Sequence, residues 1–162
     1  MTASRKPAKP RRRKPKPPAN VLAAVKRQAD GHRTARRQNA AETAEDYVEL
    51  IDDLIRTHGE ARAVDLATRL GVSHVTVTKT IRRLQREGLV RTEPYRAIFL
   101  EPQGQRLAEV CRTRHELVLG FLRAIGVDDE TARRDAEGIE HHVSETTLRA
   151  MSNVVKRLSS GS

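Results

Sequence analysis

Apolar residues recur at helical spacing along most of residues 42–158, which predicts a mainly α-helical chain. The first such segment starts at Glu42. Its predicted inward-facing stripe is Tyr47, Ile51, Leu54 and Ile55. His58-Gly59 predicts the end of this helix, because glycine readily adopts the left-handed conformation that caps a helix.

Two shorter helices follow, at about residues 63–70 and 74–87, and their spacing fits a helix-turn-helix. Their predicted inward residues are Val64, Ala67 and Leu70 in the first helix and Val77, Ile81 and Leu84 in the second. Gly71 permits the tight turn between them, and Ser73 is a good N-cap for the second helix. Leu89–Glu93 and Ala97–Leu100 are predicted to form a short hairpin. Together these elements form a winged helix-turn-helix.

Three more helices are predicted, at about residues 103–125, 130–142 and 145–158. The apolar set of the first is Leu107, Val110, Cys111, Leu117, Val118, Phe121 and Leu122. Asp128-Asp129 and Ser144 are expected to cap the other two. Gly138 lies inside a predicted helix, where glycine costs about 1 kcal/mol relative to alanine. We therefore expect a packing or close-approach reason for it.

Positive charge is concentrated at the N-terminus of this 162-residue chain. The formal net charge is +10, of which residues 1–40 contribute +12 and residues 41–162 contribute −2. Five of the seven prolines fall in residues 1–20, so this segment is expected to be disordered, and residues 21–40 to order only partly. The extension is either a basic arm that binds DNA phosphates or a solubilising tail.

Composition excludes several classes of protein. The sequence holds no apolar run long enough for a membrane span and no secretory signal, so no membrane partner is expected. The lone cysteine, Cys111, cannot form an internal disulfide, which favours the cytoplasm. With four aromatic residues and no tryptophan, binding that relies on base stacking is disfavoured.

The second helix of the helix-turn-helix carries side chains suited to double-stranded DNA. Its candidate DNA-contacting residues are Ser73, His74, Thr76, Thr78, Lys79, Arg82 and Arg83. These are hydrogen-bond donors on the element that enters the major groove, and Arg96 at the wing tip is placed to reach a neighbouring phosphate. The alternative is a winged helix that contacts protein, with its basic side chains merely solvated.

A second group of residues has spacings suited to a metal site. Asp46 and Glu49 share one side of the first helix, and Glu137, Glu140 and His141 share one side of the fifth. His115 lies in the middle of the fourth helix. Four carboxylates and two imidazoles favour Mn²⁺ or Fe²⁺ over a structural zinc site, which usually has cysteine. Acid pairs on helices are also common as solvated faces, and that alternative stays open.

The order of these motifs resembles that of the manganese transport regulators, a branch of the diphtheria toxin repressor family. The resemblance covers about residues 42–150. It rests on Asp46-Tyr47-Val48-Glu49, the winged helix, Arg114-His115-Glu116-Leu117 and the segment Asp135-Ala136-Glu137-Gly138-Ile139-Glu140-His141-His142-Val143-Ser144. In that family the winged helix binds DNA, the following helices form the dimer, and a metal site between them controls DNA binding.

The resemblance implies a ligand set and a function. The implied ligands are Asp46, Glu49, His115, Glu137, Glu140 and His141, which would hold two Mn²⁺ ions per subunit. The iron-responsive branch has sulfur ligands where this chain has Asp46 and Glu137, which favours the harder Mn²⁺. The implied protein is a Mn²⁺-responsive, homodimeric repressor of a palindromic operator that controls manganese homeostasis, not an enzyme, with no small organic substrate.

Two alternatives remain open from the sequence. One keeps the same fold with Fe²⁺ or Zn²⁺ as effector, and the other is a di-metal carboxylate enzyme in a helical bundle. The expected domains are a basic extension (1–40), a winged helix-turn-helix (41–101), a helical metal-binding and dimerisation domain (102–158) and a frayed C-terminus (159–162).

Overall fold

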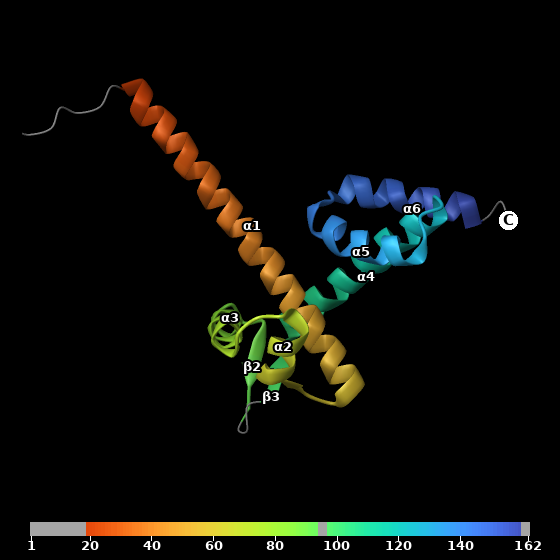
Figure 1. Ribbon diagram of the computed structural model, residues 1–162, viewed down its shortest axis with the longest axis horizontal. Helices are drawn as coiled ribbons and strands as arrows, with labels where there is room; N and C mark the ends of the chain where they lie inside the picture. The colour runs from red at the N-terminus through yellow and green to blue at the C-terminus, as the bar shows by residue number, and fades with distance from the viewer. Residues whose placement is uncertain (1–18, 94–96, 160–162) are drawn as a thin grey trace, which may run out of the picture. The chain divides into compact units, whose positions relative to one another are not determined.

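The computed structural model describes residues 19–93 and 97–159 (Figure 1). The chain divides into two compact units, residues 1–38 and 39–162. Arg96, the expected wing contact, lies outside the described residues, and so do residues 1–18, for which disorder was expected. Within the described parts, no helix is both long and apolar enough to cross a membrane.

Helix α1 (Ala19–His58) begins well before the expected start at Glu42. Residues 21–40, expected to order only partly, are helical throughout. They are rich in alanine and arginine, which are strong helix formers, and no proline occurs between Ala19 and His58. Intrinsic propensity, which a search for amphipathic periodicity does not register, accounts for this extra helix.

The winged helix-turn-helix is present as expected. It consists of α2 (Ala63–Leu70), α3 (His74–Arg86) and the hairpin strands β2 (Val90–Thr92) and β3 (Ala97–Leu100). Gly71 takes the left-handed conformation at φ 64°, and the Ser73 hydroxyl accepts from the Thr76 N–H at 3.2 Å. A third strand, β1 (Ala61–Arg62), extends the antiparallel sheet to the order β1-β3-β2. Two residues are too few to show an alternating pattern, so the sequence did not reveal β1.

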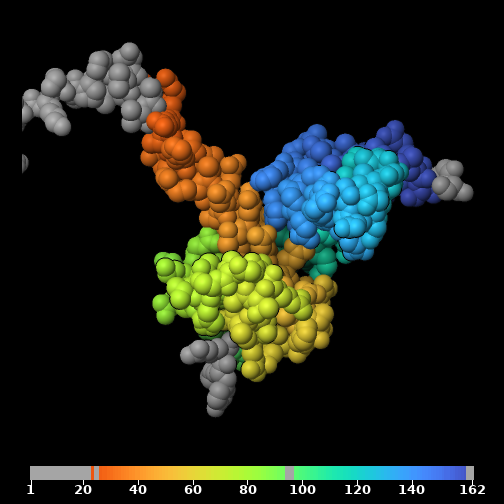
Figure 2. All heavy atoms as spheres, in the orientation of Figure 1, coloured from red at the N-terminus to blue at the C-terminus, as the bar shows by residue number. Residues whose placement is uncertain are grey.

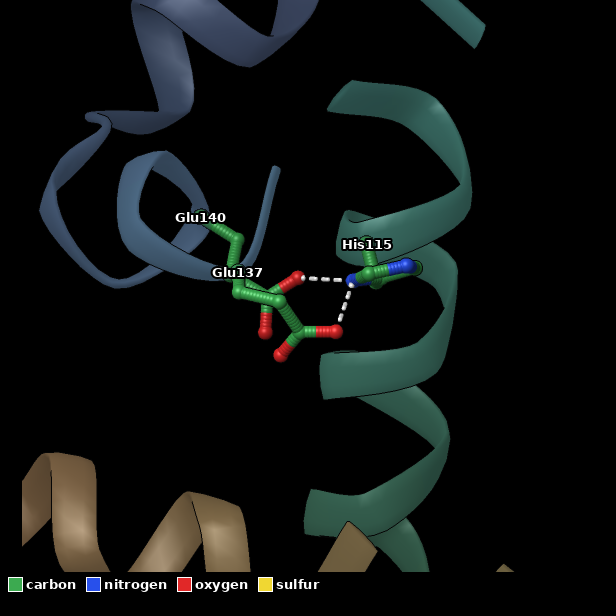
Figure 3. A group of neighbouring side chains, drawn as sticks. All are labelled: His115, Glu137 and Glu140. Carbon is green, nitrogen blue, oxygen red and sulfur yellow. Dashed lines mark hydrogen bonds and ion pairs between the residues drawn. The ribbon is translucent and has the colours of Figure 1, made fainter. Parts of the chain in front are cut away.

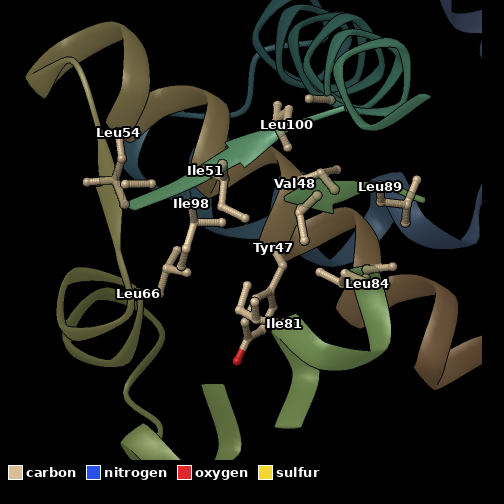
Figure 4. Packing of buried hydrophobic residues seen from close by; sticks show 14 of the residues in the cluster. Tyr47, Val48, Ile51, Leu54, Leu66, Ile81, Leu84, Leu89, Ile98 and Leu100 are labelled. Carbon is tan, nitrogen blue, oxygen red and sulfur yellow. The ribbon is translucent and has the colours of Figure 1, made fainter. Parts of the chain in front are cut away.

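One apolar core joins α1 to the winged helix (Figure 4). Its fully buried residues include Val48, Ile51, Leu66, Val77, Leu84 and Ile98. The expected inward position of Val64 is wrong, because its side chain is 58% exposed and Leu66 is buried instead. Val64 and Leu66 lie about half a turn apart on this eight-residue helix, so only one of them can face the core. The larger leucine side chain buries more apolar area there.

The C-terminal helices form a second apolar cluster. Helix α5 (Asp129–Ile139) and helix α6 (Glu145–Ser159) both pack against α4 (Pro102–Ala124). Asp128 and Ser144 cap α5 and α6 as expected. The expected helix to residue 142 instead ends at Ile139 and continues as the 3-10 turn η2 (Glu140–His142). Val110, expected to face inward, is 56% exposed.

A close backbone approach occurs at Gly104 rather than at Gly138. A Cβ atom at Gly104 would lie 2.1 Å from the Leu89 carbonyl oxygen, which also accepts from the Glu101 N–H at 2.9 Å. At Gly138 a Cβ would meet no described atom within 4 Å, so the expected close approach there is wrong. Gly104 therefore lets the first turn of α4 lie directly against the residue that precedes strand β2.

Candidate metal centre

Helix α4, the end of α5 and the turn η2 bring three candidate ligands together (Figure 3). One ligand atom each from His115, Glu137 and Glu140 lies within 4.8 Å of the other two. His115 Nδ1 is 2.7 Å from Glu140 Oε2 and 3.8 Å from Glu137 Oε1. Glu140 is only 1% exposed, whereas Glu137 lies at the surface. A buried carboxylate beside an imidazole and a second carboxylate is a donor set that a divalent cation would fit.

His141 connects this group to α1. Its Nε2 lies 3.2 Å from Asp46 Oδ1 and 3.6 Å from Glu140 Oε1. The sixth candidate, Glu49, lines the same surface hollow as Asp46 and Glu137. Contacts thus connect five of the six candidates into one chain, and Glu49 faces the same hollow. The 3-10 turn η2 presents Glu140 and His141 on this side although the regular helix has already ended.

The carboxylates at this centre are partly buried and repel one another. Burial raises the pKa of Glu49, and the nearby charge of Glu140 raises it further. Burial also raises the pKa of Asp46, and neighbouring carboxylates add to that effect against the opposing charge of His141. The hydrogen bond to Glu140 raises the pKa of His115. A divalent cation would lower the repulsion among the carboxylates.

The donor set fits a hard cation such as Mn²⁺. Carboxylate oxygens are the ligands that such ions prefer, and the six candidates contain no sulfur. The only cysteine of the sequence, Cys111, is buried in α4, and burial raises its pKa to about 12. A thiol with that pKa stays protonated at neutral pH.

Two residues that sequence reasoning did not select lie beside the candidate ligands. Glu45 Oε2 is 2.8 Å from His141 Nδ1 and accepts a hydrogen bond from Arg114 Nη2 at 2.5 Å. Glu45 lies four residues before Glu49, on the same side of the helix, but nothing in the local sequence indicates that it contacts His141. Arg114 had no signal beyond its place next to His115. The Glu45–Arg114 contact spans 69 positions of the sequence and the Glu45–His141 contact spans 96. Contacts over such separations leave no periodic pattern in the sequence.

Most of the candidate DNA-contacting residues lie on the exposed face of α3, the helix whose atoms are yellow-green in Figure 2. His74, Thr76, Lys79 and Arg82 are exposed, and the Ser73 oxygen is occupied as the N-cap. Thr78 is half-buried, and its hydroxyl donates to the His74 carbonyl.

Two side chains change the composition of this face. Arg83 turns away from it, and its guanidinium donates to the Ala40 carbonyl oxygen of α1 at 3.0 Å. Val75, which sequence reasoning did not select, is 63% exposed on α3. An exposed apolar side chain on a recognition helix suits contact with a thymine methyl group.

Comparisons with known proteins agree with this arrangement. Two family models match consecutive parts of the chain. The N-terminal DNA-binding domain of the iron-dependent repressors matches residues 40–98, and their metal-binding and dimerisation domain matches residues 101–160. The transcriptional regulator MntR of Escherichia coli O6:H1 is 52% identical over 129 residues, which are 80% of this chain and 83% of that protein. The chain belongs to the diphtheria toxin repressor family, in its MntR branch.

Other family members extend the comparison. The HTH-type transcriptional regulator MntR of Lysinibacillus sphaericus is 41% identical over 112 residues, 69% of this chain and 81% of that protein. A manganese-dependent transcriptional repressor solved with manganese superposes with a TM-score of 0.61 at 31% identity, covering 72% of this chain and 52% of that one. The regulator IdeR of T. acidophilum gives a TM-score of 0.63 at 27% identity, covering 71% and 53%. The chain thus spans about half the length of these solved structures.

Membership of this family decides several of the expectations. The family consists of metal-dependent DNA-binding regulators. The prediction of a regulator is therefore confirmed, and the alternative of a di-metal carboxylate enzyme is wrong. The mainly α fold, with a winged helix-turn-helix followed by metal-binding and dimerisation helices, is confirmed as well.

Proposed function

We propose that this family member is a Mn²⁺-activated repressor that binds a palindromic operator as a homodimer in the cytoplasm and controls manganese homeostasis genes. One observation carries the proposal. The carboxylates of Asp46 and Glu137 contact His141 and His115 within a connected set of oxygen and imidazole donors. By the resemblance described above, these two carboxylates replace the sulfur ligands of the iron branch. Carboxylates favour the harder ion.

The proposed ligands are Asp46, Glu49, His115, Glu137, Glu140 and His141. Four carboxylates are enough to bridge two cations, and Glu49, Glu137 and Glu140 are the proposed shared ligands. Two Mn²⁺ ions per subunit would balance the four negative charges of the carboxylates. The bound metal would neutralise the repulsion described above and tie α1 to α4 and to η2.

The proposed switch works through α1. This helix carries Asp46 and Glu49, and it also holds the recognition helix α3 through the Arg83 hydrogen bond to Ala40. Metal that pulls α1 toward α4 would therefore fix the placement of α3. The proposed ligands on α1, α4 and η2 would shift the population of arrangements if they bind metal more tightly in the DNA-competent one. Within a homodimer, fixed recognition helices would match two half-sites about one helical turn apart.

The proposed DNA contacts come from α3 and the wing. His74, Thr76, Lys79 and Arg82 offer exposed donors, with Ser73, Thr78 and Arg96 as further candidates. Arg83 is better explained as a link to α1 than as a phosphate contact. The domain boundaries proposed from the sequence, at residues 41–101 and 102–158, meet at the start of α4. The proposed ligands come from both parts, with Asp46 and Glu49 in the first and the other four in the second.

A titration of DNA binding against metals tests the function. The protein is prepared free of metal, Mn²⁺ is added, and an operator is selected from random duplex DNA. The affinity of the protein for this operator is then measured as a function of free Mn²⁺, Fe²⁺ or Zn²⁺. We expect Mn²⁺ to raise the affinity for the operator more than the affinity for non-specific DNA. At matched free concentrations, Mn²⁺ should raise operator affinity more than Fe²⁺ or Zn²⁺ does. Equal operator affinity with and without metal would contradict a metal-activated repressor, and stronger activation by Fe²⁺ or Zn²⁺ would reassign the effector.

Asp46→Met is expected to change the choice of metal. The substitution replaces a charged oxygen ligand with a neutral thioether, which favours later and softer ions. The fold and the dimer should persist, because Asp46 is about half exposed on α1. Operator binding at matched free-metal concentrations should lose selective activation by Mn²⁺, with Fe²⁺ or Co²⁺ relatively better. An unchanged rank order of metals would place selectivity elsewhere, with Glu137 the first residue to examine.

Deleting residues 1–38 is expected to weaken non-specific DNA binding. The deletion removes thirteen basic residues and one acid but keeps Ala40, the partner of Arg83. Fewer phosphate contacts release fewer counterions, so the salt dependence of binding should become shallower by about 0.9 in log–log slope for each phosphate that the shortened protein no longer neutralises. Operator preference should persist. A solubilising tail would instead leave the salt dependence unchanged.

A further inference from the structure

Glu45 connects α1 to both α4 and η2 through one carboxylate oxygen. Its Oε2 lies 2.8 Å from His141 Nδ1, and the same atom accepts a hydrogen bond from Arg114 Nη2 at 2.5 Å. The three side chains are largely shielded from solvent, with exposed fractions of 20% for Glu45, 16% for Arg114 and 11% for His141. Such a shielded, charge-assisted arrangement is stronger and more directional than an exposed pair.

This arrangement fixes which nitrogen of His141 faces the candidate ligands. An imidazole that donates its Nδ1–H to a carboxylate keeps the lone pair on Nε2, the form in which histidine binds a metal. His141 Nε2 is the nitrogen that lies 3.2 Å from Asp46 and 3.6 Å from Glu140. Glu45 thus sits behind the ring, on the side away from the proposed ions.

We propose that Glu45 is a positioning residue for metal binding, which orients His141 through Nδ1 and is itself held by Arg114. The inference rests on the proposed function, because it assumes that His141 is a ligand. Glu45 is not counted as a ligand, because its Oε2 lies at Nδ1 of His141, whereas the candidate ligands Asp46 and Glu140 lie at Nε2.

Arg114 gives Glu45 the charge and direction that this role needs. Its guanidinium donates to the same Glu45 oxygen that faces His141, and such a charge-assisted hydrogen bond favours a carboxylate in its ionised form. The guanidinium comes from α4, the helix that also carries His115. Arg114 therefore fixes the position of the Glu45 side chain relative to the helix of a second proposed ligand. Without Arg114, the Glu45 carboxylate would face the nearby charge of Asp46 with only His141 to oppose it.

The neighbouring pair Glu42 and His142 provides a matched control. Glu42 lies one helical turn before Glu45 on α1, and its Oε1 is 3.5 Å from His142 Nδ1. His142 follows His141 directly, but it is 69% exposed and lies outside the candidate ligand set. A substitution at Glu42 therefore removes a carboxylate–histidine contact of the same kind without touching the proposed centre.

The experiment measures Mn²⁺ binding to full-length, metal-free protein by the EPR signal of free Mn²⁺, which reports affinity and ion count. Glu45→Ala is expected to weaken binding about 10–100-fold at an unchanged number of ions, as partners of metal-binding histidines do. Glu45→Gln, which keeps a carbonyl acceptor for Nδ1–H, should recover part of the loss. Arg114→Ala should weaken binding in the wild-type background but add little to Glu45→Ala. Glu42→Ala should leave binding unchanged.

Several results would overturn the proposal. Wild-type affinity in Glu45→Ala would remove any positioning role, and loss of one ion would make Glu45 a direct ligand. Equal losses in Glu45→Ala and Glu42→Ala would show a general charge effect instead. If Glu45→Ala does not fold, as judged by circular dichroism of the metal-free protein, the near-isosteric Glu45→Gln and Arg114→Ala decide the question by the same criteria. Wild-type protein that binds no Mn²⁺ would instead refute the proposed function.

Discussion

Replacing His141 with alanine is expected to abolish metal-activated DNA binding while the protein stays folded. His141 is the side chain that joins the ligands of α1 to those of η2, because its Nε2 faces both Asp46 and Glu140. Its loss should lower Mn²⁺ affinity by more than about 100-fold, since even the partners of metal-binding histidines contribute about 10–100-fold. Operator affinity measured against free Mn²⁺ gives the result. Glu137→Ala should have the same outcome, because its carboxylate is a proposed shared ligand.

The fold should survive the His141 substitution for a structural reason. The two apolar clusters do not include His141, and Glu45 keeps its hydrogen bond to Arg114. His142→Ala is the control, because this histidine is exposed and its Nδ1 lies 3.5 Å from Glu42 rather than against a candidate ligand. A normal response of His141→Ala to Mn²⁺, or an equal defect in His142→Ala, would show that the proposed centre is wrong.

Gly104→Ala is expected to be the most destabilising substitution of a helical glycine in the described chain. In an ordinary helix interior, alanine is more favourable than glycine by about 1 kcal/mol. At Gly104 the added Cβ would lie 2.1 Å from the Leu89 carbonyl oxygen and 3.3 Å from Leu100 Cδ2. The backbone must shift to relieve this contact. We expect the free energy of unfolding to fall by roughly 1–3 kcal/mol, the range for overpacked sites.

Gly120→Ala in the same helix should have the opposite sign. A Cβ at Gly120 would meet no described atom within 4 Å, so the substitution should stabilise by about 0.4–1 kcal/mol through the unfolded chain. Urea denaturation of the two variants and the wild type, in metal-free buffer, measures both effects. Equal changes in the two variants would show that α4 does not approach Leu89 as closely as the structure has it.

Local signals in the sequence were sufficient to predict the winged helix-turn-helix. The left-handed glycine at Gly71 and the hydroxyl cap at Ser73 act within a few residues, and both are found as predicted. Helix faces were harder to predict where the choice depends on a distant partner. Val64 and Leu66 are both apolar, and only the packing of α2 onto the shared core decides between them.

The candidate site was predicted as residues but not as a geometry. Spacing alone selected Asp46 with Glu49 and Glu137 with Glu140 and His141, while the resemblance to a family united them with His115. The sequence did not reveal the 3-10 turn at Glu140–His142 or the role of Glu45, because both depend on contacts between elements far apart in the chain. Periodicity reports which way a residue faces on its own helix, but not which residue it meets there.

The Arg83 hydrogen bond has a consequence for how sequence variation is interpreted. Its acceptor is the main-chain oxygen of Ala40, an atom that every amino acid supplies. The side chain at position 40 is therefore free to change while the bond persists, whereas position 83 must keep a long side chain that can donate. Correlated substitutions between the two positions would not arise, so comparing related sequences for covariation would miss the link between α1 and α3.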